Sequence, residues 1–538
     1  MFSSPALRSL CLLLLALALA TPVLVVAGSW LAGASPNWAH LSSTVLPSYL
    51  RHSLFLAMFT GTGTLLIGVS AAWAVARFRF PGRRVLEWAL LLPLACPAYL
   101  IAYTWTGMLA SEGALQQALP LPLPDIRSPA GAGLMLTLVL YPYVYLMTRA
   151  AFVSQSAVAL EVARTLGAGP WRRFFRVALP LARPAIIAGL ALVLMETLAD
   201  YGTVAYFGVP TLSTGIYRTW FGLGDALAAA QLAGVLLLAM VVLLTLERRA
   251  RKERRISVAS ARAAVPLPLG RGPGLLLAAT LWLPVLLGFI LPALQLLVWS
   301  LPRWRDLAEP GFLGLLGTSL LIALCTALAA TGLGLLLIWA RRLRGDRPRR
   351  LAAGLAGFGY AVPGTVLAVG VVLVLASLDR GLNDLLASVG LPEPGLLFSG
   401  TLFAVVFACT VRFLTIPIQG LDAGLQALSP NLDNAARSLG TAPLPMMRRV
   451  HLPLLRVPLA TSALLVFVDT LKELPAALVL RPFNTNTLAV RAFELASDER
   501  LADAALPALT ILLAGVAPVI LLTRSIRSPD RESPHADH

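Results

Sequence analysis

Charged residues are scarce in this chain, and their scarcity excludes an ordinary soluble protein. Only 13% of the 538 residues are charged, whereas 58% are apolar. The mean hydropathy is +0.79. A typical soluble domain carries about 25% charged residues. Lipid rather than water must therefore surround most of this chain.

Cysteine is rare as well. The sequence has four cysteines, all inside apolar runs and without a close-spaced pair: Cys11, Cys96, Cys325 and Cys409. They indicate neither a disulfide framework nor a cysteine-based metal site, and we interpret them as small packing residues. No Ser-His-Asp, Cys-His or metal-ligand spacing stands out either. We expect no enzymatic chemistry, no firm metal site and no cofactor on this chain.

Lysine is almost absent, which excludes an ATPase site of the P-loop class. A P-loop needs a lysine directly after a glycine, so that loop amides and ammonium hold the phosphates together. The two lysines, Lys252 and Lys472, follow an arginine and a leucine. If ATP drives this protein, a separate chain must use it.

Long apolar runs are abundant. Helices rising about 1.5 Å per residue cross a hydrocarbon core of about 30 Å with about twenty residues. Twelve runs are long enough, approximately 9–32, 53–76, 86–110, 129–153, 184–208, 227–246, 274–300, 312–340, 350–377, 397–419, 457–480 and 505–523. The strands of a membrane β-barrel would instead alternate in polarity over about ten residues. We predict an all-α membrane protein with about 12 transmembrane helices.

The first apolar run resembles a signal peptide in its position after Arg8. It exceeds the usual h-region of about 7–15 residues and lacks a convincing small-residue cleavage site. We expect it to be retained as a helix.

The net charge of +17 is explained by membrane topology. Arginines cluster after alternate predicted helices, as at Arg77 to Arg84, Arg248 to Arg255 and Arg341 to Arg350. The positive-inside rule places these loops in the cytoplasm, together with both termini. The loops near 33–52, 111–128, 209–226, 302–311, 378–396 and 481–504 then lie outside. No nucleic-acid partner is needed to explain the basic charge.

Two cytoplasmic segments match each other closely. The first reads Glu161-Val-Ala-Arg-Thr-Leu-Gly167 and the second Asn434-Ala-Ala-Arg-Ser-Leu-Gly440; nine residues later come Val-Ala-Leu-Pro-Leu and Val-His-Leu-Pro-Leu. Each pair differs by 273 positions over about forty residues, which indicates duplication of a six-helix unit. We expect halves at 1–246 and 273–526, a basic cytoplasmic linker at 247–272 and a polar tail at 527–538.

This repeated pattern resembles the EAA loop of ABC-importer permeases. The resemblance implies two six-helix halves of the type I importer permease (MetI-like) fold. It also implies a short coupling helix in each half that docks on a separate ATPase, two copies in all, and passes ATP-driven closure to the membrane helices. The implied ATPase-coupling residues are Glu161, Ala163, Gly167, Leu179, Pro180, Asn434, Ala435, Ala436, Gly440, Leu452 and Pro453.

Mechanical coupling needs a rigid helix, a compact turn and a fixed return into the membrane. The two glycines allow close approach or a left-handed turn, and the two prolines can mark the end of each segment. Asn434 replaces the glutamate, so any ion pair of Glu161 should be weaker or absent in the second copy and docking should be asymmetric. The alternative, a merely basic interfacial helix, is disfavoured by two copies at one offset.

Carboxylates occur inside two predicted helices. Glu196 and Asp200 share one face of the fifth helix, and Asp469 and Glu473 occupy the equivalent places in the eleventh. A charge at the bilayer centre costs about 2.5–3.5 kcal/mol, so all four should avoid lipid. We hypothesise that they line the translocation pathway and favour a cation. The alternative is that they are fold-specifying polar contacts, with Lys472 pairing Asp469.

Further stretches resemble the ferric-iron branch of fused ABC permeases. They are residues 195–203, 206–210, 214–220, 360–365, 469–475, 480–484 and 494–499. The resemblance covers nearly the whole chain and implies a bacterial inner-membrane permease that receives ferric iron from a solute-binding protein at the outer face. Carboxylates suit a hard cation. Thiamine permeases share the fused design and thiamine is also cationic, so that substrate stays open.

A secondary transporter is the alternative from another class, since it can also have twelve helices in two repeats and can use intramembrane carboxylates for ion coupling. It would not need paired loops of the Gly-x9-aliphatic-x-Leu-Pro form.

Overall fold

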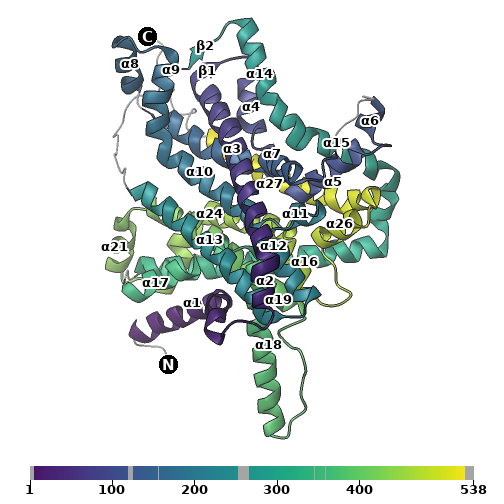
Figure 1. Ribbon diagram of the computed structural model, residues 1–538. Helices are drawn as coiled ribbons and strands as arrows, with labels where there is room; N and C mark the ends of the chain where they lie inside the picture. The colour runs from purple at the N-terminus through teal and green to yellow at the C-terminus, as the bar shows by residue number, and fades with distance from the viewer. Residues whose placement is uncertain are drawn as a thin grey trace. The chain divides into compact units, whose positions relative to one another are not determined.

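Helices make up almost all of the computed structural model, which describes residues 5–118, 125–155, 157–252, 266–343, 346–357 and 359–527 (Figure 1). Within these residues, 9 helices are long and apolar enough to cross a membrane, and the number rises to 12 if three bent helix pairs each count as one span. The only sheet in the described ranges is a parallel pair of two-residue strands, β1 (Phe78–Arg79) and β2 (Leu267–Pro268). The prediction of an all-α protein with about 12 spans is confirmed.

The chain forms two compact units, and each contains helices from both halves of the sequence. Unit one comprises the described residues of 1–37, 216–237 and 305–491. Unit two comprises those of 38–215, 238–304 and 492–538. The first spans of the two halves are therefore exchanged between the units. The halves at 1–246 and 273–526 stay a prediction about the sequence repeat, and much of the expected linker and tail lies outside the described residues.

The first helix of the chain, α1 (Pro5–Gly28), is packed within unit one against α17 (Arg347–Ala356) and α18 (Gly364–Ser388). Near its start, Ser9 Oγ donates to Asp346 Oδ2 at 2.9 Å and accepts from Arg349 Nε at 3.1 Å. Further along, α18 approaches so closely that Gly370 leaves no room for a Cβ against the carbonyl of Pro22. These contacts make α1 part of unit one, and its retention stays a prediction.

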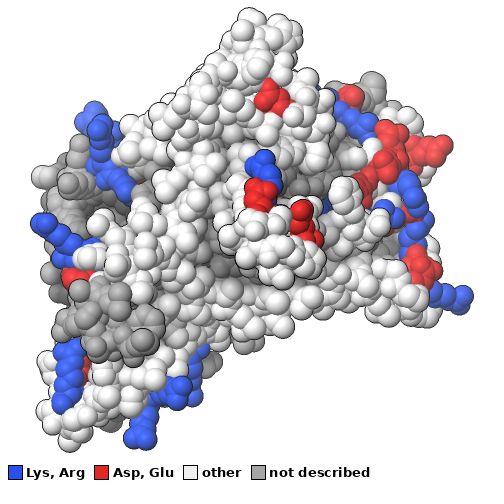
Figure 2. Space-filling view, turned by 90° about the horizontal axis from the view of Figure 1, so that it is seen from below, with Lys and Arg blue, Asp and Glu red and all other residues white. Residues whose placement is uncertain are grey.

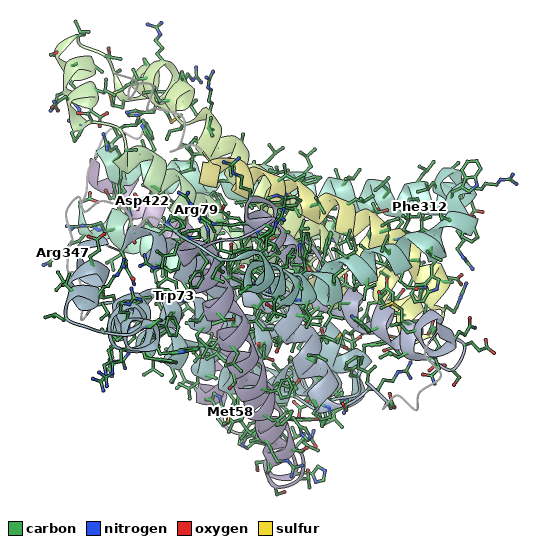
Figure 3. All side chains as sticks on the ribbon, turned by 90° about the horizontal axis from the view of Figure 1, so that it is seen from above. Met58, Trp73, Arg79, Phe312, Arg347 and Asp422 are labelled. Atoms are coloured by element: carbon green, nitrogen blue, oxygen red, sulfur yellow. The ribbon has the colours of Figure 1, made fainter. Side chains whose placement is uncertain are left out.

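Unit two is built around α3 (Leu46–Arg77), α7 (Pro129–Ser154) and α10 (Leu179–Ala199), which lie side by side (Figure 1). Small residues make this possible: a Cβ on Gly68 of α3 would lie 2.8 Å from Val144 Cβ, and one on Gly189 of α10 would lie 2.9 Å from Val144 Cα. Such residues let membrane helices approach closely. In Figure 3, Met58 and Trp73 mark two parts of α3; Met58 is exposed, whereas the Trp73 ring contacts Phe152 at 5.1 Å between centroids.

Two further groups of helices belong to unit two. They are α4 (Arg83–Ala89), η2 (Leu92–Ala95) and α5 (Ala98–Leu109), and α14 (Arg271–Val285), α15 (Leu291–Ser300) and α27 (Leu501–Arg527). Of these, α15 packs on α27, and α14 packs on α4.

Unit one uses the same packing principle around α16 (Pro310–Leu343), which contacts α19 (Leu402–Phe413), α20 (Thr415–Gln426) and α24 (Arg456–Leu471). A Cβ on Gly334 of α16 would lie 2.9 Å from Pro417, and one on Gly424 of α20 would lie 3.0 Å from Pro458. The close approach holds α16 against α20 and α20 against α24, the helices on either side of the second predicted coupling segment.

An apolar window does not detect a break at proline, so one predicted span has an unforeseen bend and another has wrong boundaries. The run 86–110 is bent by 92° between η2 and α5, where Pro93 and Pro97 supply no backbone N–H. The run 350–377 combines α17 with α18, which starts after Pro363 and continues to Ser388. Much of the surface visible in Figure 2 carries no charged side chain, as expected of helices in contact with lipid.

Candidate coupling segments and intramembrane carboxylates

The first predicted coupling segment begins with α8 (Ala157–Thr165), which ends in a left-handed glycine. Gly167 has φ +77°. Its N–H donates to Arg164 O at 3.0 Å, and Ala168 N donates to Ala163 O at 2.9 Å. These two bonds close the helix C-terminus in the way that a glycine at this position allows. The turn predicted from the sequence is present.

The second segment repeats this geometry. Helix α21 (Pro430–Ser438) is followed by Gly440 with φ +72°. Gly440 N donates to Arg437 O at 3.0 Å, and Thr441 N donates to Ala436 O at 3.0 Å. Both glycines have open space where a Cβ would be, so the left-handed backbone and not crowding is what requires glycine.

After the turn, each segment continues as a short helix that starts with proline, α9 (Pro170–Arg173) or α22 (Pro443–Met446), followed by a five-residue π-helix. The π-helices are η3 (Phe174–Ala178) and η7 (Met447–His451), and Leu-Pro follows each of them. Proline has no N–H and its ring collides with the carbonyl four residues earlier, so a wider turn relieves the clash. A third π-helix, η4 (Leu286–Ile290), also precedes Leu-Pro, which makes this feature a local effect of sequence.

The predicted coupling residues of each segment lie on one short stretch of chain. In the first, Glu161 is exposed, Ala163 is half-buried, and Leu179 and Pro180 form the first turn of α10. In the second, Asn434 and Ala435 are exposed, Ala436 is buried, and Leu452 and Pro453 start α23 (Leu452–Leu454).

Large apolar side chains stand out from both segments. Leu166 is 81% exposed, Trp171 74% and Leu439 83%. Leu444 and Phe175 are exposed as well. Exposed apolar groups beside arginines are typical of a surface that binds another protein.

The second carboxylate of each intramembrane pair caps a short helix beyond a break. Asp200 follows the end of α10 and precedes α11 (Gly202–Tyr206); its Oδ2 accepts from Thr203 N and Val204 N, both at 3.1 Å. Glu473 follows α24 and precedes α25 (Pro475–Leu480); its Oε1 accepts from Ala476 N at 3.1 Å. Each carboxylate satisfies N–H groups that the start of a helix leaves without partners.

The first carboxylates of the two pairs lie one turn earlier. Asp469 Oδ1 is 2.8 Å from Lys472 Nζ, the partner that the alternative hypothesis named, and Glu196 is half-buried on α10. Glu196 and Asp200 belong to unit two and Asp469 and Glu473 to unit one, so a pathway shared by all four stays a prediction.

Within the described residues, no group of three or more His, Cys, Asp or Glu side chains could hold a metal ion.

Sequence reasoning missed two arginines and a histidine that engage these sites. Arg412 Nη1 donates to Glu473 Oε1 at 2.8 Å. Arg342 pairs with Asp433, one residue before Asn434, and His451 contacts the same carboxylate. One feature of the sequence could have indicated the Asp433 contacts. The second copy has Asn434 where the first has Glu161, and its carboxylate, Asp433, stands one residue earlier.

Comparison with known proteins agrees with this architecture. The family described as "Binding-protein-dependent transport system inner membrane component" matches residues 64–255 and again residues 330–528. The two matches confirm that the permease domain is present twice.

Three relatives illustrate the range of the similarity. The Fe(3+)-transport system permease protein FbpB 2 of Haemophilus influenzae is 26% identical over 483 residues, covering 88% of this chain and 89% of the relative. The thiamine transport system permease protein ThiP of Salmonella typhimurium is 27% identical, with 90% of each chain covered. The molybdenum transport system permease protein ModB of Escherichia coli is 31% identical over 36% of this chain and 87% of its own length. Because the family's pattern covers more than half of the sequence in two copies, this chain belongs to the family of inner membrane components of binding-protein-dependent transport systems.

Proposed function

We propose that this chain is the transmembrane permease subunit of an ATP-driven importer, and that two copies of a separate ATPase dock on its two coupling segments. One observation carries the proposal: a helix, a left-handed glycine, a helix that starts with proline and a π-helix follow one another in the same order twice, at an offset of 273 residues. A rigid element of this kind can pass a movement from a partner to the membrane helix that follows.

The exposed groups of the segments support docking. Leu166, Trp171 and Leu439 offer apolar contact area, and Glu161 is available for an ion pair with a basic group of the ATPase. Ala163 is half-buried and Ala435 is exposed, and a small residue at these two positions allows close approach of a partner backbone. Ala436 is buried and packs inside this chain.

Ferric iron is the cargo that we propose, delivered by a solute-binding protein at the outer face. The iron permease of Haemophilus influenzae aligns with this chain over most of its length, and intramembrane carboxylates suit a hard cation. The thiamine permease of Salmonella typhimurium aligns over a similar share, so thiamine is the second candidate. Both termini are proposed to face the cytoplasm of a bacterial inner membrane, in accord with the basic loops.

Calorimetry on the partner binding protein tests the substrate. Tight binding of ferric ion with no binding of thiamine supports iron import, and the reverse result assigns thiamine.

The carboxylates Glu196, Asp200, Asp469 and Glu473 are proposed to line the translocation pathway, where two of them also hold the helix breaks. Neutralising the two that lie inside α10 and α24, Glu196→Gln with Asp469→Asn, tests this role and leaves the caps at Asp200 and Glu473 in place. Normal folding with lost import supports a pathway role; unchanged import contradicts it.

A further inference from the structure

The two coupling segments differ in how they join the membrane helix that follows. In the first copy, Pro170–Ala199 is one continuous span. In the second copy, Pro443–Leu454 and Arg456–Leu471 meet with a bend of 75°. A push on the first segment can therefore travel along one helix, whereas a push on the second is interrupted at the bend.

A buried side-chain network links the second segment to a different membrane helix. Arg342, in the last turn of α16, donates from Nε to Asp433 Oδ2 of α21 at 2.7 Å. Its Nη1 and Nη2 donate to the carbonyl oxygens of Leu425 and Leu428 at 2.9 and 3.1 Å. The other oxygen of the carboxylate, Oδ1, is 2.9 Å from His451 Nε2 in η7. One carboxylate thus joins α16, α21 and η7.

The network is shielded from water. The side chains of Asp433 and His451 are 8% and 1% exposed, and that of Arg342 is 18% exposed. Separating a buried ion pair leaves two poorly solvated charges, so the pair resists being pulled apart. The neighbouring Arg341 forms an ion pair with Asp422 of α20. Asp422 is labelled in Figure 3. The end of α16 is therefore held at two adjacent points.

The first segment has no equivalent carboxylate at this place. The offset of 273 puts Leu160 opposite Asp433 and Ala178 opposite His451. The first copy has its carboxylate at Glu161, which is exposed. The carboxylate is thus exposed in the first copy and buried in the second, where Asn434 occupies the exposed position.

We propose that Asp433 is a positioning residue that couples the second segment to α16 through Arg342. This inference rests on the proposed function, since it takes the ATPase to be the source of the movement. When the ATPase displaces α21, the carboxylate carries Arg342 and the end of α16 with it. Because α16 packs on α19, α20 and α24, the displacement reaches the core of unit one despite the bend before α24.

The test measures the ratio of cargo imported to ATP hydrolysed. It uses vesicles that contain the complete complex of permease, ATPase and binding protein. Ferric iron serves as the probe and phosphate release counts the ATP. With Asp433→Asn, the ATPase should still associate and hydrolyse ATP, while iron imported per ATP falls about fivefold or more. Arg342→Lys is the second variant; it keeps a cation for Asp433 but cannot hold both carbonyls, so the ratio should fall in the same direction.

Asp384→Asn, the same change at an exposed carboxylate of α18 outside both segments, is the matched control. It should leave ATPase association and the import per ATP of assembled complexes within about twofold of wild type. A ratio that stays within about twofold for Asp433→Asn, or for Arg342→Lys if the asparagine variant does not fold, overturns the proposal. Absence of ATP-dependent import by the wild-type complex is a different result and contradicts the proposed function itself.

A second measurement needs no cargo. Spin labels at the exposed positions Leu336 of α16 and Asn431 of α21, in a variant without the native cysteines, report the distance between these helices. The distance should stay constant when ATP is added to the wild-type network and should change or broaden with Asp433→Asn. A change of equal size in both proteins contradicts a rigid link.

Discussion

Arg412 and Glu473 form an ion pair of 2.8 Å inside unit one, with side chains that are 11% and 6% exposed. The same carboxylate oxygen also accepts from Ala476 N. A cation and a helix N-terminus thus converge on one oxygen at the break between α24 and α25. This arrangement gives Glu473 a structural role in addition to the proposed pathway role.

Replacing Glu473 by leucine should lower the stability of the protein strongly. The change removes a buried charge from its partner, and removal of one member of such a pair costs about 3–5 kcal/mol. Thermal unfolding of the purified protein in detergent measures the effect. Asp469→Asn serves as the control, because the Asp469–Lys472 pair is more exposed and such pairs contribute about 0–1 kcal/mol. Equal losses of stability in both variants would show that the buried Arg412–Glu473 pair stabilises the protein no more than the Asp469–Lys472 pair does.

Leucine at Gly167 and Gly440 should separate the permease from its ATPase. Both positions have positive φ, where a side chain costs about 1–2 kcal/mol and favours a different turn. We expect less ATPase to co-purify with the double variant. Gly169→Ala is the control: it lies two residues from Gly167, has φ −64° and has open space for a Cβ. Full ATPase recovery with the double variant would rule out these turns as parts of the docking site.

Alanine at Asp200 should destabilise the start of α11. Its carboxylate accepts from two backbone N–H groups and from Thr203 Oγ1, and loss of such a cap costs about 0.5–2 kcal/mol. Faster amide exchange at Thr203 and Val204 is the expected result. Asp200→Asn keeps an accepting oxygen and should preserve most of the protection. If asparagine and alanine behave alike, the charge rather than the cap is what matters at this position.

Acid should weaken the network at the second coupling segment. Burial alone would raise the pKa of Asp433, but hydrogen bonds from Arg342 and His451 outweigh it and lower that pKa below the ordinary value of 3.8. The stabilisation is therefore complete above pH 3.8 and is lost as the pH falls through the lowered pKa. The difference in thermal stability between wild type and Asp433→Asn should shrink over this acid range. A difference that grows as the pH falls would contradict the assignment.

The sequence predicts the helical class, the repeat and the coupling turns because each depends on local signals. Apolar runs identify spans, and Gly167 and Gly440 stand where their helices end. The interruptions at Pro97 and after Asp200 escape an apolar window, since the flanking residues remain hydrophobic.

The ion pairs could not be predicted because they join residues far apart in sequence. Arg342 and Asp433 are 91 positions apart and Arg412 and Glu473 are 61 apart. Only the fold brings them together. The exchange of first spans between the compact units has the same origin: packing of α1 on α18 depends on Gly370 meeting Pro22, and nothing near either residue in sequence indicates the other.

Uptake by vesicles that contain the purified permease, with and without its ATPase, shows whether ATP or an ion gradient drives transport. We expect cargo presented on the binding protein to enter only when the ATPase and ATP are present on the cytoplasmic side, and we expect an ion gradient alone to move none. Uptake driven by an ion gradient in vesicles without any ATPase would contradict this expectation.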